Sequence, residues 1–119
     1  MSEIAKTSDI TIRVGLDANR VPVKIEWAAS DMHPAGTFEP CKAMAVALFD
    51  EKSRDTLRID LWTKEMQVME MDRFTYQILR TLSQTYLRAT QNKELAEDLA
   101  RFAQHFGEKT EILETGAQG

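Results

Sequence analysis

The residues best suited to nucleophilic catalysis are one cysteine, Cys41, and two histidines, His33 and His105. A catalytic thiol needs a histidine base within hydrogen-bond reach. Cys41 starts an apolar stretch, where a free cysteine usually acts as a small hydrophobic residue. His33 lies in a loop beside Pro34, and His105 falls on the polar face of a predicted helix. The sequence therefore indicates no Cys–His pair, and we expect no catalytic residues and no enzymatic activity.

Three methionines, Met66, Met69 and Met71, could act as soft ligands for Cu(I). Together with Trp62 they define one interpretation of the chain, a small-ligand or metal-binding protein. Methionine also fills irregular gaps in hydrophobic cores, and we favour that role here, at a strand–helix junction. The sequence contains no CxxC, HxxxH or EF-hand spacing, so we expect no metal and no other cofactor.

Arg58, Asp60 and Trp62 alternate with apolar residues, which places all three on one face of a predicted strand. If that strand is central in a sheet, a partly covered Arg–Asp–Trp surface is a good anchor for a partner protein. If the strand lies at an edge, the two charges merely deter edge-to-edge pairing. We predict these three residues as partner-binding residues.

Composition excludes several classes of protein. The 119 residues carry a formal net charge of −4 with no concentrated basic patch, so we expect no nucleic-acid partner. No GxGxxG, Walker A or GxSxG motif occurs. A single cysteine cannot form an internal disulfide, and no apolar run is long enough for membrane insertion. We expect a cytoplasmic protein.

Hydrophobic periodicity predicts most of the secondary structure. Two alternating runs, residues 10–16 and 21–27, predict a β-hairpin with Asn19 in its turn, and residues 57–61 predict a further strand. A long helix is predicted over residues 68–89. A second helix should begin at Asn92 as its N-cap, with Gly107 as the glycine that follows its last turn.

Residues 41–50 fit two patterns. As a helix they place one set of residues on a single face: Cys41, Met44, Ala45, Leu48 and Phe49. As a strand they would have apolar residues on both faces. Three alanines and a methionine favour the helix, and the strand stays the alternative.

These elements give an α+β fold with the order ββαβαα, in which helices pack on one face of a small antiparallel sheet. We expect one domain over residues 1–119, with an ordered core at about residues 8–112 and short tails at both ends. The apolar stripe of the long helix is wider than one small sheet can cover, so we also expect a homo-oligomer formed through that helix.

Residues 56–66 (TLRIDLWTKEM) and 70–74 (EMDRF) resemble the family of the bacterial gliding motility protein GldC. Flanking residues agree, at 23–27 (VKIEW), 42–50 and 88–90, and the similarity covers roughly residues 8–112. The resemblance implies a non-catalytic, cytoplasmic accessory protein of the gliding motility apparatus, whose partners are proteins of the gliding or secretion machinery. It carries over no catalytic or ligand-binding residues.

Overall fold

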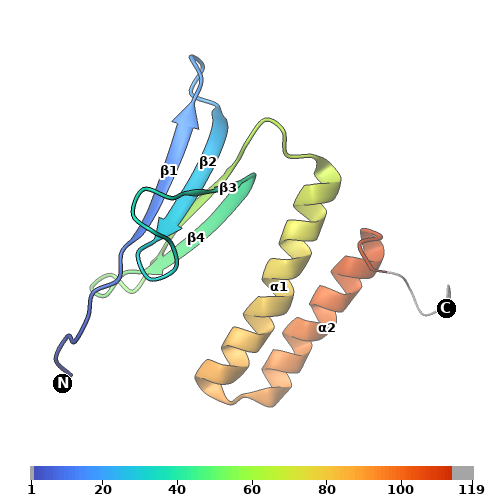
Figure 1. Ribbon diagram of the computed structural model, residues 1–119. Coiled ribbons are helices and arrows are strands. Elements are labelled where there is room, and N and C mark those ends of the chain that lie inside the picture. The colour runs from blue at the N-terminus through green and yellow to red at the C-terminus, as the bar shows by residue number, and fades with distance from the viewer. Residues whose placement is uncertain (1, 114–119) are drawn as a thin grey trace. The chain divides into compact units, whose positions relative to one another are not determined.

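The computed structural model describes residues 2–113, which contain five strands and two helices (Figure 1). Contacts divide the chain into two compact units, with the boundary between Met66 and Gln67. We call them the strand unit and the helical unit. The fold class is α+β, with two small antiparallel sheets and two helices. The packing of helices on a sheet stays a prediction.

The first sheet confirms the predicted hairpin. Strands β1 (Ile10–Leu16), β2 (Pro22–Ala29) and β3 (Glu39–Cys41) pair in that order, each antiparallel to its neighbour. Apolar residues of β1 and β2 lie opposite one another, as in the pair Val14 and Ile25. Ile25 is only 1% exposed and is the largest fully buried side chain of the described residues. Burial covers only part of this apolar face, because Ala29 is buried as well whereas Ile10 and Ile12 remain exposed.

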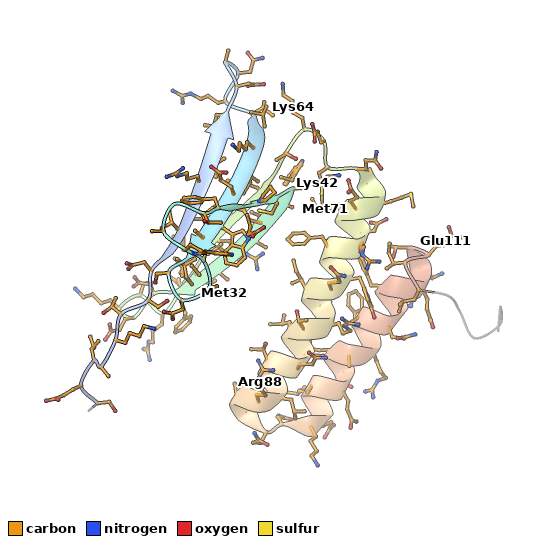
Figure 2. The ribbon with its side chains drawn as sticks, viewed as in Figure 1. Met32, Lys42, Lys64, Met71, Arg88 and Glu111 are labelled. Atoms are coloured by element: carbon orange, nitrogen blue, oxygen red, sulfur yellow. The ribbon has the colours of Figure 1, made fainter. Side chains whose placement is uncertain are left out.

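The turn between β1 and β2 is built around Asp17. Its carboxylate accepts hydrogen bonds from the backbone N–H groups of Asn19 (2.8 Å) and Val21 (3.0 Å) and forms an ion pair with Lys64, which lies near this turn in Figure 2. The hydrogen bond from Lys64 lowers the pKa of Asp17 to about 2. Within this turn Arg20 adopts a positive φ, of 63°.

The helix preferred for residues 41–50 is wrong. That segment belongs to two strands, β3 and β4 (Ala43–Phe49), and β4 pairs along its whole length with β5 (Thr56–Trp62). The pairing of each β4 residue with one on β5 overrides the high helix propensity of alanine and methionine, because strand formation depends mainly on cross-strand neighbours. The observed order is therefore five strands followed by two helices.

The helical unit confirms both predicted helices. Helix α1 spans Val68–Thr90 and helix α2 spans Lys93–Lys109. The side chain of Asn92 caps α2 by accepting a hydrogen bond from the backbone N–H of Leu95 at 3.2 Å. Five residues of these helices are buried: Tyr76, Ser83, Ala96, Ala103 and Gly107.

Gly107 does not follow the last turn of α2, because the helix continues to Lys109. A Cβ atom at Gly107 would lie 3.0 Å from a ring carbon of Tyr76. The glycine is therefore a site of close packing between the helices.

Neither described helix combines the length and apolar composition needed to cross a bilayer. The C-terminal tail expected beyond about residue 112 falls, from residue 114 onward, outside the described residues.

Candidate functional site

The second sheet has two chemically different faces, because its side chains alternate between them. We call the polar one the hairpin face. It consists of four residues of β4 and the four opposite them on β5: Ala43, Ala45, Ala47 and Phe49, and Thr56, Arg58, Asp60 and Trp62. The other face is apolar: Met44, Val46, Leu48, Leu57, Ile59 and Leu61.

The hairpin face brings the three predicted partner-binding residues together. Arg58 donates two hydrogen bonds to Asp60, from Nη2 to Oδ1 at 2.7 Å and from Nε to Oδ2 at 3.3 Å. Across the strand pair, Asp60 lies opposite Ala45 and Arg58 lies opposite Ala47. The alanine side chains are too short to cover the charged groups, and both Arg58 and Asp60 remain exposed.

The guanidinium of Arg58 contacts the carboxylate of Asp60 through two nitrogen atoms, an arrangement that favours one relative orientation of the two groups. The hydrogen bond to Asp60, and then its charge, raise the pKa of the Arg58 guanidinium above the ordinary value. Arg58 therefore keeps its positive charge at every physiological pH. The pair thus presents a positive and a negative group side by side on an exposed face.

Aromatic residues lie at both ends of the hairpin face. Trp62, opposite Ala43, is 54% exposed, and Phe49, opposite Thr56, is 69% exposed. Phe49 was missed by the sequence analysis because the helical interpretation placed it on a core stripe. The alternation of small and large residues along 43–49 is the signal that could have found it. Protein-binding surfaces are enriched in aromatic residues and arginine, the residue types that this face exposes.

Cys41 and the histidines take structural positions. Partial burial raises the pKa of the Cys41 thiol, whereas a reactive cysteine needs a lowered pKa. The Nδ1 atom of His33 accepts a hydrogen bond from the backbone N–H of Ala29 at 3.1 Å, and its ring contacts Trp27 with the centroids 4.9 Å apart. His105 is exposed on α2, in the other unit.

The methionines do not form a cluster within the helical unit. Met69 and Met71 are two residues apart on α1 (Met71 is labelled in Figure 2), a spacing that turns their side chains about 200° from each other around the helix axis. Trp62 and Met66 belong to the strand unit. Among residues 2–113, no three histidine, cysteine, aspartate or glutamate side chains gather as metal ligands would. The structure thus gives no specific observation in favour of the metal-binding interpretation.

The helical unit contains a shallow groove between α1 and α2, with a volume of about 490 Å³. Its lining residues mix apolar and charged side chains: Arg80, Ser83, Gln84, Leu87, Lys93, Ala96, Glu97 and Ala100. No side-chain nitrogen or oxygen atom is buried without a hydrogen-bond partner among the described residues. Among its lining residues, the buried Ser83 already donates its hydroxyl hydrogen to the backbone oxygen of Arg80, at 2.6 Å.

Comparison with known proteins gives one match. A family model described as "Gliding motility-associated protein GldC-like" matches residues 22–112, which include the hairpin face. No curated protein and no solved structure matches the chain.

Proposed function

Because the chain belongs to the GldC-like family of gliding motility-associated proteins, we propose that it is a non-catalytic accessory protein of the gliding motility apparatus. In this proposal it acts in the cytoplasm by binding other proteins of the gliding or secretion machinery. The hairpin face is the binding surface, and Arg58, Asp60 and Trp62 are its central residues.

One observation carries this proposal: an exposed Arg58–Asp60 pair joined by two hydrogen bonds lies on the same face as two exposed aromatic rings, those of Trp62 and Phe49. Arginine and tryptophan are the residues most enriched among those that dominate binding energy. An exposed ion pair adds little to the stability of the chain itself. We therefore attribute the arrangement to recognition of a partner.

The chemistry of the remaining polar groups supports a non-catalytic role. The raised pKa of Cys41 makes its thiol a weak nucleophile at neutral pH. The lone pair of His33 Nδ1 is already engaged by the backbone of Ala29. A cytoplasmic location agrees with a chain whose single cysteine requires no oxidising compartment.

The test is partner capture from gliding cells with the full chain as bait. Trp62→Ala should lose the captured gliding component, while the free energy of unfolding falls by only about 1–2 kcal/mol, since half of the ring is already exposed. Phe102→Ala is the matched control, because Phe102 is also 54% exposed but lies on α2. That variant should capture the same partner as the unmodified chain.

The same variants can be tested in living cells. A strain without this protein should lose gliding, and Phe102→Ala should restore it whereas Trp62→Ala should not. Equal capture and equal gliding with both variants would refute the hairpin face as the binding surface. Unfolding of Trp62→Ala would instead show that Trp62 is a core residue, in which case Asp60→Ala tests the same surface without removing a ring.

A further inference from the structure

The outer edge of β4 lacks a partner strand. Within residues 2–113, β4 pairs with β5 and with no other strand. The backbone of Lys42 accepts a hydrogen bond from Thr63 at 2.8 Å, and the N–H of Asp50 donates to Asp55 at 2.9 Å. Because strand residues face a neighbour alternately, the even-numbered residues from 42 to 50 point toward β5. The odd-numbered residues Ala43, Ala45, Ala47 and Phe49 therefore direct their N–H and C=O groups away from it.

This edge also lacks the usual protection against pairing. Natural edge strands carry charged residues, prolines or bulges that prevent another strand from adding to them. β4 has the sequence AMAVALF, with no charged or polar side chain and no proline. Four of its residues are exposed: Ala45, Ala47, Leu48 and Phe49. A two-stranded sheet is marginally stable by itself, so a further strand at this edge would stabilise the β4–β5 hairpin.

A charged residue on an added strand would find no charge of β4 itself to pair with, so an apolar strand suits this edge best. Each of the other strands of the chain carries at least one charged residue: Arg13 in β1, Lys24 and Glu26 in β2, Glu39 in β3, and Arg58 and Asp60 in β5. Among the described strands only β4 itself is free of charged residues. We infer that β4 pairs with β4 of a second copy of this chain, antiparallel and around a two-fold axis, which forms a homodimer through a strand edge.

The orientation of the free groups selects a register. Hydrogen-bonded pairs across the new edge must join odd-numbered residues of one copy to odd-numbered residues of the other. A two-fold axis that passes through Val46 satisfies this condition and pairs all seven residues of β4. Ala45 then lies opposite Ala47 of the second copy, and Ala43 lies opposite its Phe49. Each of these pairs exchanges two backbone hydrogen bonds. The large phenylalanine ring faces the small alanine, so the hairpin face of the dimer has no steric conflict.

The result is a four-stranded sheet with the order β5–β4–β4–β5. Its apolar face becomes continuous across the axis. Its hairpin face presents two copies of Arg58, Asp60 and Trp62 related by the axis, which suits a two-fold symmetric partner or one long partner. This inference does not depend on the role in gliding, because the edge would self-pair whatever the hairpin face binds.

Cysteine cross-linking of the full chain tests the register, in a Cys41→Ala background that removes the native thiol. On a two-fold axis the Cα atoms of residue 46 in the two copies lie about 4.5 Å apart, within the range of a disulfide. Val46→Cys should therefore give a covalent dimer on mild oxidation. Leu48→Cys is the matched control from the same face of β4, because its two copies would lie about 14 Å apart along the strands.

Charge substitution provides a second, independent test, read by light scattering at micromolar concentration. The unmodified chain should be a dimer. Ala45→Lys with Ala47→Lys places like charges opposite each other and should weaken the dimer by about tenfold or more. Ala45→Lys with Ala47→Glu pairs opposite charges in the same register and should restore it. Circular dichroism checks that all variants remain folded.

Three outcomes would overturn the inference. An unmodified chain that is monomeric would show that β4 does not pair with β4 of a second copy. Equal cross-linking of the Val46→Cys and Leu48→Cys variants would show that no defined register exists. A dimer that is equally stable in both charge variants would place the interface elsewhere, for example on α1. A variant that loses partner capture but still dimerises would bear on the proposed function alone. A variant that loses dimerisation but still captures the partner would bear on this inference alone.

Discussion

Substitution of Gly107 should reveal how tightly the two helices pack. Gly107 is buried in α2, and a Cβ atom there would lie 2.6 Å from Cδ1 and 2.9 Å from Cγ of Leu113, and 3.0 Å from Cδ1 of Tyr76. Replacement of a helical glycine by alanine stabilises a helix by about 1 kcal/mol through backbone entropy. Overpacking of a buried site costs about 1–3 kcal/mol. We therefore expect Gly107→Ala to lower the free energy of unfolding by about 0–2 kcal/mol.

A second substitution separates the two effects. Leu113→Ala removes the two shortest contacts but keeps the backbone hydrogen bond from the N–H of Leu113 to the carbonyl oxygen of Gly107, at 3.0 Å. In that background only the contact with Tyr76 remains, so the cost of Gly107→Ala should fall by about 1–2 kcal/mol. Urea unfolding of the four proteins measures this coupling. Additive effects within about 0.5 kcal/mol would refute the reasoning, because they would mean that Leu113 does not pack against Gly107.

Three further substitutions test local features. Asn92→Ala should cost about 0.5–2 kcal/mol by removing the acceptor for the N–H of Leu95. Asp17→Asn should lower the melting temperature near neutral pH. Because the pKa of Asp17 is lowered from 3.8 to about 2 in the folded chain, its contribution is present above pH 3.8 and is lost as the pH falls to about 2, where the two proteins should converge. His33→Phe should cost about 1–3 kcal/mol, since the N–H of Ala29 loses its acceptor.

Each of these substitutions has a control. Asn92→Ser keeps a capping oxygen and should be nearly neutral. Asp55→Asn changes the same kind of side chain in a different turn and should leave the melting temperature near neutral pH almost unchanged. His105→Phe alters an exposed histidine and should change the free energy of unfolding by less than about 0.5 kcal/mol. Equal effects of substitution and control would contradict the structural reason given for that residue.

The sequence predicted those elements whose periodicity is unambiguous. The hairpin of β1 and β2, strand β5 and both helices follow from patterns that fit one structure only. Residues 43–49 fit both a strand and a helix, because alternating alanines and larger apolar residues also produce a helical stripe. What decides between them is the pairing of Ala45 with Asp60 and Ala47 with Arg58, a long-range contact that a local pattern does not contain. The short strand β3, which includes Pro40, depends in the same way on its pairing with β2.

The candidate site was predicted in part for the same reason. Arg58, Asp60 and Trp62 share a face because strand β5 was correctly identified, and their separation along that strand follows from alternation alone. The two hydrogen bonds between Arg58 and Asp60 could not be predicted, since they depend on the free space above the alanines of β4. Phe49 could join the site only after its strand was known.

The distribution of apolar side chains links the two proposals. In the strand unit, the buried hydrophobic residues are Ile25 and Ala29, while large apolar residues such as Leu48, Leu57 and Ile59 remain exposed on the apolar face. Any contact that removes this apolar surface from water is favoured by the hydrophobic effect. Binding that covers such surface in the folded state also stabilises the fold by mass action. Under the two proposals the uncharged strand edge and the hairpin face therefore have different roles: self-association at the edge would stabilise the fold, and the Arg58–Asp60 pair on the face would give specificity for a partner.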